Sequence, residues 1–196
     1  MSQTTLDIKE PGLNILPPGV ERHVVNAGGL TGLQIYPDDE IEIINDEGNQ
    51  ICEIICFNKD GKSELGILNQ KENGKESFIK EILKRKDESS LVTNLQLKKR
   101  NLDINKSKSS ILFDDQTPSG EKIRIKSKDK CYVIFSAPQN EMLISEQNPS
   151  SDLTLFIKRA KIVNDKELSV IPDPVFEPSY EKNIDRETSI SYQVKE

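Results

Sequence analysis

The sequence has no tryptophan, few aromatic residues and a single histidine. Aromatic residues make up 5% of its 196 residues, too few to indicate a stacking platform for single-stranded nucleic acid. The formal net charge is -6, which opposes the phosphate neutralisation that drives non-specific DNA and RNA binding. We therefore expect no nucleic-acid partner.

Long hydrophobic runs are also missing. No run approaches the roughly 20 apolar residues of a membrane-spanning helix, and the start, MSQTTLDIKEPGLN, lacks the basic and apolar parts of a secretion signal. Three cysteines are an odd number, from which no disulfide framework follows. We expect a cytoplasmic protein with reduced cysteines and no membrane contact.

What the sequence does contain is apolar residues that alternate with polar ones, a pattern typical of β-strands. EIEIIN alternates cleanly, Asp46, Glu47 and Gly48 favour a turn, and QICEIICF follows, which predicts an antiparallel hairpin over 40–58. GEKIRIK and the apolar CYVIFSAP, joined by SKDK, predict a second hairpin. Further strands are predicted in VERHVVNA, GLQIY, LVTNLQL and DLTLFIKRAKIV.

One short amphipathic helix is predicted near residues 75–88, where apolar residues recur at helical spacing in KESFIKEILKRKDESS. We predict a mostly-β fold: an antiparallel sandwich or distorted barrel with this helix packed on it and an extended C-terminal arm. The predicted organisation is an extended lead-in over 1–18, a β domain over 19–167, and a Pro-rich arm over 168–196 that leads into a further domain.

The candidates for chemistry are few. His23, in a predicted strand, is either a general base or metal ligand, or a surface or half-buried histidine, and we favour the second interpretation. Cys52 and Cys56 share one face of a strand but lie roughly 13 Å apart, too far for one metal ion or a disulfide. Together with Cys131 they are interpreted as small buried residues.

Glu53 lies in an otherwise apolar strand. It is either on the solvent face of an edge strand, which we slightly favour, or a buried carboxylate that requires a partner. A binding pocket built from Glu53, Cys56 and His23 is kept as a hypothesis, which requires that the three side chains converge. No catalytic group and no metal site is predicted.

The two predicted hairpins carry a resemblance to a known family. PPGVERHVVNAGG followed by DDEIEIINDEGNQICEIICFN resembles the opening of the urea-carboxylase-associated family, through Asp46, Gly48, Asn49 and Gln50 and the closing pair Phe57–Asn58. In that family Asp often stands where this sequence has Glu53. PSGEKIRIKSKDKCYVIFSAPQ resembles the closing part of the family. Together these stretches cover about a third of the chain.

The middle of the chain departs from that pattern. Members of the family carry cysteine and histidine residues there that resemble metal ligands, whereas residues 59–112 of this chain contain neither. The resemblance thus implies a degenerate copy without the metal site. Members of the family also occur fused to aminomethyltransferase modules of the glycine-cleavage T type, which bind tetrahydrofolate. The resemblance therefore implies the N-terminal domain of such a one-carbon transferase.

The expected function is thus a non-catalytic accessory or scaffolding domain of a folate-dependent aminomethyltransferase-like protein. Its expected partners are neighbouring domains of the same longer chain, and homo-oligomer formation stays open. No cofactor is expected in this domain, whereas the resemblance implies tetrahydrofolate as a cofactor of the parent protein. The alternative is a small-molecule-binding or metal-independent enzymatic β-barrel domain that acts alone.

Overall fold

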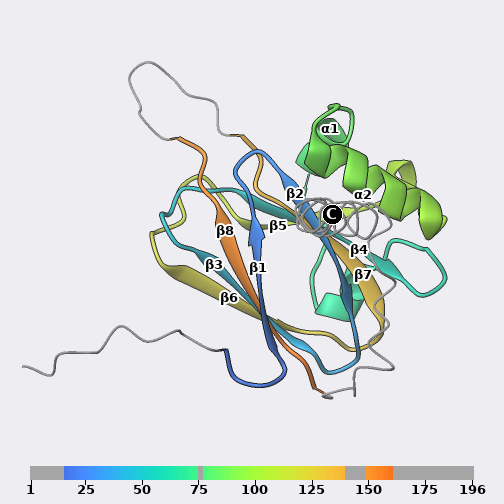
Figure 1. The fold of residues 1–196 in the computed structure, drawn as a ribbon, viewed down its shortest axis with the longest axis horizontal. Helices are drawn as coiled ribbons and strands as arrows, with labels where there is room; N and C mark the ends of the chain where they lie inside the picture. The colour runs from blue at the N-terminus through green and yellow to red at the C-terminus, as the bar shows by residue number, and fades with distance from the viewer. Residues whose placement is uncertain (1–15, 75–76, 140–148, 161–196) are drawn as a thin grey trace, which may run out of the picture.

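The computed structural model describes residues 16–74, 77–139 and 149–160, and these form two four-stranded antiparallel sheets packed face to face (Figure 1). The mostly-β prediction is confirmed, and the arrangement is a sandwich. Sheet A has the strand order β1-β8-β3-β6 and sheet B the order β2-β7-β4-β5. The strands are β1 (Val20–Val25), β2 (Leu30–Ile35), β3 (Glu40–Asn45), β4 (Cys52–Asn58), β5 (Ser109–Phe113), β6 (Glu121–Lys126), β7 (Cys131–Ser136) and β8 (Leu153–Lys158).

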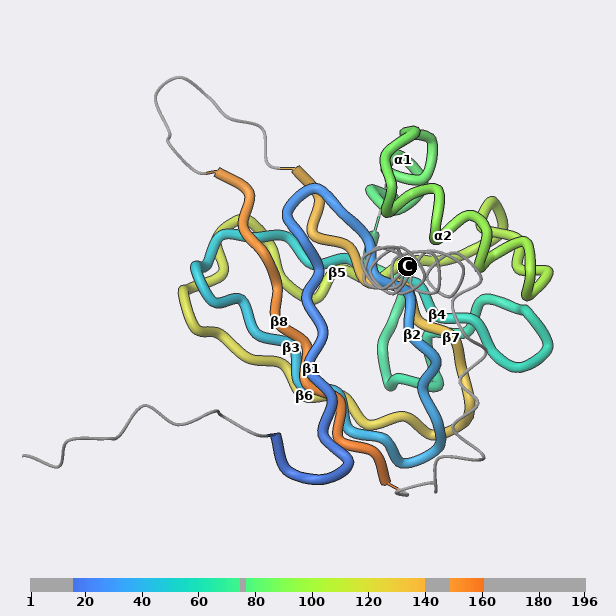
Figure 2. Tube along the Cα trace, viewed as in Figure 1, coloured from blue at the N-terminus to red at the C-terminus, as the bar shows by residue number. Residues whose placement is uncertain are grey.

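Both predicted hairpins are wrong, although their strands exist. The strands β3 and β4 lie in different sheets, as do β6 and β7. β3 pairs instead with β6 and β8, and β4 pairs with β5 and β7 (Figure 2). The physical reason is that each turn carries the chain across the sandwich, so the apolar faces of successive strands meet across the core instead of side by side.

The turn between β3 and β4 is held by its own side chains. Asn45 donates to the carbonyl of Gln50 (2.8 Å), and Gly48 and Asn49 have positive φ angles of 81° and 55°. A Cβ on Gly48 would lie 2.6 Å from the backbone nitrogen of Ser119, so only glycine fits there. The residues Asp46 to Gln50, one part of the stretches that carry the family resemblance, therefore form a cross-sheet turn.

The side chain of Gln50 links this turn to two more segments. Its side-chain amide, which is fully buried, donates to the carbonyl of Pro138 (2.9 Å) and accepts from the backbone N–H of Ser151 (2.8 Å). These residues follow β7 and precede β8, so one side chain ties the ends of both sheets together. Its hydrogen bonds meet the requirement that a buried amide be satisfied.

The helical region differs from the prediction. The helix α1 (Phe78–Ile82) is shorter than expected, and LVTNLQL is not a strand but part of the helix α2 (Glu88–Lys99). Asp87 caps α2 by accepting from the backbone N–H of Ser90, and Lys98 and Lys99 lie in its last turn. These end signals outweigh the alternating pattern. Short 3₁₀ turns are η1 (Leu65–Leu68) and η2 (Ile104–Lys106).

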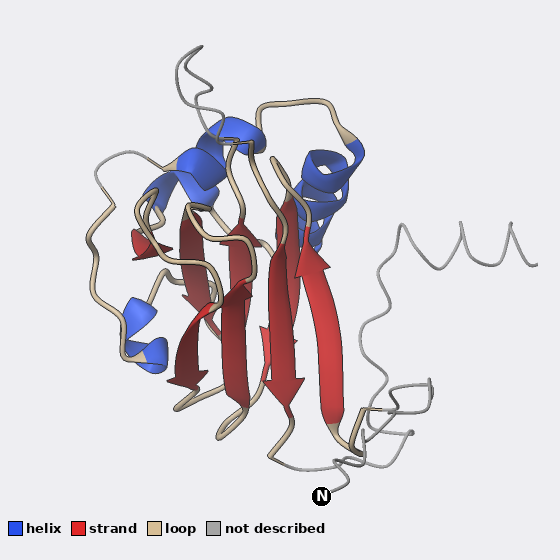
Figure 3. Cartoon of the chain, turned by 90° about the vertical axis from the view of Figure 1, so that its left-hand side faces the viewer, coloured by secondary structure: helices blue, strands red, loops and turns tan. Residues whose placement is uncertain are grey.

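The sandwich has two apolar clusters. The larger lies between the sheets, and the smaller lies between the outer face of sheet B and the helices. In Figure 3 the outer face of sheet A is turned towards the viewer. No described helix covers this face, and α1 and α2 lie on the far side of the sandwich. The two outer faces of the sandwich therefore differ in what covers them.

Parts of the predicted organisation lie outside the described residues. These are most of the lead-in, the end of the predicted β domain beyond residue 160, and the Pro-rich arm over 168–196. Within the described ranges, no helix has the length and apolar character needed to cross a membrane.

Candidate functional site

The structure does not bring the three sequence candidates together. Glu53 and Cys56, both on β4, point to opposite sides of sheet B: Glu53 hydrogen-bonds to α1, and Cys56 belongs to the cluster between the sheets. His23 lies on β1 in the other sheet, half-buried, and pairs with Glu21 (3.1 Å). The pocket that requires all three side chains to converge is therefore not formed.

Glu53 is fully buried, contrary to the favoured solvent-face interpretation. One carboxylate oxygen accepts from the backbone N–H of Ile79 in α1 (2.7 Å). The other makes no hydrogen bond of regular geometry among the described residues, although the Ser109 and Ser77 hydroxyls act to lower the pKa. Burial outweighs these contacts and raises the pKa of Glu53. The geometry makes Glu53 an anchor for α1.

All three cysteines are buried free thiols, as the sequence indicated. Burial is the largest cause that raises the pKa of Cys52, and contact with the Cys131 thiol, followed by burial, raises that of Cys56. Cys131 also lies 3.6 Å from the hydroxyl of Ser127. A raised pKa keeps Cys52 and Cys56 protonated and poorly nucleophilic, whereas the hydrogen bond with Cys56 lowers the pKa of Cys131. In the described ranges, no three His, Cys, Asp or Glu side chains are placed to hold a metal ion.

An ion-pair cluster at one end of the sandwich joins β1 to the segment after β8. Arg159 donates two hydrogen bonds of 2.8 Å to Glu21 and one of 2.6 Å to Asp39, which is 1% exposed. Hydrogen bonds from His23 and then Arg159 lower the pKa of Glu21 to about 2. The arrangement satisfies the charges of its members and fixes the ends of the strands.

A cleft of about 550 Å³ lies between α2 and the strands β1 and β2. His23 and Tyr132 line it together with hydroxyl and amide side chains of α2. The Tyr132 ring is stacked under the guanidinium of Arg100, whose carbon lies 4.5 Å from the ring centre. His23 is therefore in a concave site, but without the other two predicted residues.

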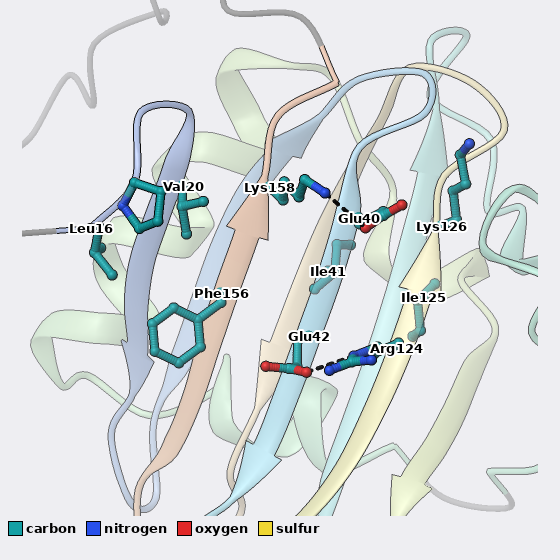
Figure 4. Close-up of a pocket in the computed structure, with 11 residues that line it drawn as sticks. Leu16, Val20, Glu40, Ile41, Glu42, Arg124, Ile125, Lys126, Phe156 and Lys158 are labelled. Atoms are coloured by element: carbon teal, nitrogen blue, oxygen red, sulfur yellow. Dashed lines mark hydrogen bonds and ion pairs between the residues drawn. The ribbon is translucent and has the colours of Figure 1, made fainter.

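A larger groove of about 700 Å³ runs over the outer face of sheet A. Its apolar side is formed by Val20, Phe156 and the lead-in residues Leu16 and Pro17 (Figure 4). Its charged side comes from the central and edge strands β3 and β6 and the end of β8, and consists of Glu40, Glu42, Arg124, Lys126 and Lys158.

One row of side chains runs across the outer face of sheet A, and three of its members, Phe156, Glu42 and Arg124, line this groove. Register pairs Arg22 with Phe156, Phe156 with Glu42, and Glu42 with Arg124, so the four side chains share the outer face. Arg124 donates to the carboxylate of Glu42 (2.6 Å), which lies between Arg124 and the Phe156 ring in the view of Figure 4. An aromatic ring beside a carboxylate is the combination that attracts methylated ammonium groups.

Sequence reasoning missed Phe156 and Arg159. A signal for Phe156 exists in LTLFIK, because Leu153, Leu155 and Ile157 alternate with Thr154, Phe156 and Lys158. The phenylalanine therefore shares a face with polar residues. For Arg159 there was no such signal, because its partners are more than a hundred residues away in the sequence.

No family model matches the chain, so the resemblance to the urea-carboxylase-associated family stays a prediction. The chain is similar to a trimethylamine-oxide aldolase from Ruegeria pomeroyi, with 31% identity over 188 residues. The matched region is 96% of this chain and 24% of that protein. The chain thus spans about a quarter of the length of the curated relative it matches.

This similarity corrects the predicted function. The relative is named as an aldolase, which is a lyase, so the predicted aminomethyltransferase, glycine-cleavage and one-carbon transferase roles are wrong. The prediction of fused neighbouring domains as partners is corrected too, because the similarity covers only 24% of the relative and gives no support for a T-type fusion. What the comparison supports is sequence similarity between this chain and a region of an aldolase.

Proposed function

We propose that this chain takes part in the aldolase-type cleavage of trimethylamine oxide, or of a close methylated amine oxide, by binding that substrate in the groove on sheet A. The observation that carries the proposal is the 31% identity with a trimethylamine-oxide aldolase over 96% of the chain. The groove adds a physical basis for the binding step.

The chemistry of the ligand fits the row of side chains across the groove. Trimethylamine oxide is a compact dipole with a positive, methylated nitrogen and a negative oxygen. The methyl groups pack on Phe156 with Glu42 beside them, because aromatic faces and carboxylates attract methylated ammonium groups. The negative oxygen points away from the Glu42 carboxylate, because two negative groups repel each other.

The test is a titration of the full chain with trimethylamine oxide, monitored through the NMR chemical shifts of the protein. We expect weak binding with shifts centred on Phe156 and Glu42. Replacing Phe156→Ala removes a contact of about 0.5–1 kcal/mol and weakens binding roughly two- to fivefold. Glu42→Gln weakens it as well. Shifts that avoid this groove, or no shifts at all, would contradict the proposal.

Two controls separate charge from shape. Glu81→Gln removes a negative charge from an exposed position on α1, on the other side of the sandwich, and should leave the binding unchanged. tert-Butanol has the shape of trimethylamine oxide but no charged nitrogen, so it should bind more weakly. The same samples are assayed for formaldehyde, since cleavage of trimethylamine oxide into dimethylamine and formaldehyde needs no oxidant; its release would extend the role to catalysis.

A cytoplasmic location is part of this proposal. Cys52, Cys56 and Cys131 are free thiols, which suits a reducing compartment. Fractionation of cells that produce the full protein tests this point, and recovery from an oxidising compartment or the medium would contradict it.

A further inference from the structure

The helix α2 presents its faces in an unusual way. Its buried residues are Ser90, Thr93, Gln96 and Leu97, whereas Leu91 and Leu95 are 52% and 45% exposed. A helix that lies on a globular protein normally turns its leucines inward and its polar residues outward. Two large exposed leucines one turn apart therefore make the outer face of α2 a candidate contact surface.

Four exposed residues of α2 form one continuous stripe. Glu88, Leu91, Leu95 and Lys98 are spaced by three, four and three residues, so they follow each other along one side of the helix. All four side chains are exposed. The stripe, called the α2 seam below, therefore has an acidic end, two leucines and a basic end.

The α2 seam is complementary to itself when reversed. In an antiparallel pair centred on Thr93, Glu88 faces Lys98 of the partner copy, and Leu91 faces Leu95 of the partner copy. Both matches hold in the same alignment because each pair is symmetric about the same residue. Antiparallel helices also place opposite ends of their dipoles side by side, which is favourable.

We propose that two copies of this chain associate through the α2 seam, as an antiparallel helix pair about a twofold axis that crosses the seam midway between Leu91 and Leu95. Such an isologous contact uses the same patch on both subunits, as most homodimers do. The leucines supply the apolar centre, and two Glu88–Lys98 pairs flank it. This inference does not depend on the proposed function.

The size of the contact limits its strength. The helix α2 has 12 residues, so the seam alone is smaller than a standard interface of about 1,200–2,000 Å². Lys84 and Lys86 are exposed just before α2 and lie towards the partner's basic end, where they weaken the attraction. The dimer is therefore concentration-dependent, with a dissociation constant expected on the order of micromolar.

The first experiment is sedimentation equilibrium of the full chain from micromolar to millimolar concentration, with charge reversals in the seam. Lys98→Glu and Glu88→Lys each place like charges at both ends of the seam and should weaken the dimer about tenfold. The double variant exchanges the charges, so opposite charges face each other again, and it should bind more tightly than either single variant. A wild-type chain that stays monomeric, or a double variant that is no better than the single ones, overturns the proposal.

A second set of variants tests the apolar centre. The double substitution Leu91→Ser and Leu95→Ser should abolish the dimer. The control is Leu16→Ser, because Leu16 is also an exposed leucine (37%) but lies at the groove on sheet A, and this variant should leave the dimer intact. Circular dichroism verifies that each variant is folded. A dimer that persists in the double serine variant would place the contact on another surface and overturn the proposal.

Discussion

The outer faces of the two sheets differ in their residues and in what packs on them. The outer face of sheet B carries Ile55, Phe57 and Ile134, and these pack against α1 and α2. The outer face of sheet A carries Glu42, Arg124 and other charged residues, and no described helix covers it. The amino-acid sequences of the strands account for this difference.

Strand composition explains which face is covered. In β7, CYVIFS, every residue is buried, because this strand is central and has apolar material on both sides. In β6, EKIRIK, only alternate residues are apolar, and the lysines and arginine are exposed. Charged residues on the open sheet also discourage it from pairing or stacking with other molecules.

The largest expected difference between the faces comes from their two phenylalanines. Phe57→Ala, in the covered cluster, should lower the free energy of unfolding by about 3–5 kcal/mol, because it empties a fully buried site. Phe156→Ala, on the open face, should cost less than about 1 kcal/mol, since the ring is already in contact with solvent. Urea denaturation of both variants measures this, and equal losses would refute the contrast.

The glutamates on the two faces should differ next. Glu53→Ala should cost about 2–3 kcal/mol, because it leaves the N–H of Ile79 without its acceptor and opens a cavity. Glu42→Ala, which breaks the pair with Arg124 on the open face, should cost less than about 1 kcal/mol. Urea denaturation at neutral pH compares the two, and a larger cost for Glu42→Ala would reverse the interpretation.

The raised pKa of Glu53 adds a pH dependence. The folded state binds this proton more tightly than the unfolded state, so its stabilising effect is present below the ordinary pKa of 4.5 and is lost as pH rises. Glu53→Gln keeps an acceptor for Ile79 but cannot titrate. The free energy of unfolding, measured across this range, should fall with rising pH more in the wild type than in Glu53→Gln.

The smallest effect is expected at Glu21, in the ion-pair cluster beside the open face. Its pKa is lowered from 4.5 to about 2, so its contribution is present above pH 4.5 and is lost as pH falls towards about 2. Because Glu21 is half-exposed, the change should not exceed about 1 kcal/mol. Glu21→Gln should flatten the acid limb of the stability curve, and an unchanged limb would exclude this role.

The local strand patterns predicted much of the fold. Alternation in EIEIIN and GEKIRIK, and the apolar run CYVIFS, identified strands that the structure contains. The same patterns failed for LVTNLQL, because the mixed spacing of Leu91, Leu95 and Leu97 also fits a helix, here one that buries polar residues as well as Leu97. The cap at Asp87 was the signal that distinguished the two.

The candidate sites were harder to predict, because they are made by strands that are distant in the sequence. The groove combines β3, β6 and β8 with the lead-in, and its central row depends on register between Phe156 and Glu42. Register follows from pairing, and pairing was assigned to the wrong neighbours when each turn was taken as a hairpin. No local pattern distinguishes a turn within a sheet from one that crosses the sandwich.

The sequence by itself determined most of the strand-forming segments, though not β5, together with the buried character of the cysteines and the acidic balance of the chain. These depend on the residue and its near neighbours. Only the tertiary structure decided that Glu53 is buried beneath α1 and that Phe156 lies beside Glu42 on an open face. Those facts depend on which side of which sheet each strand turns outward, and the packing of the whole sandwich sets that choice.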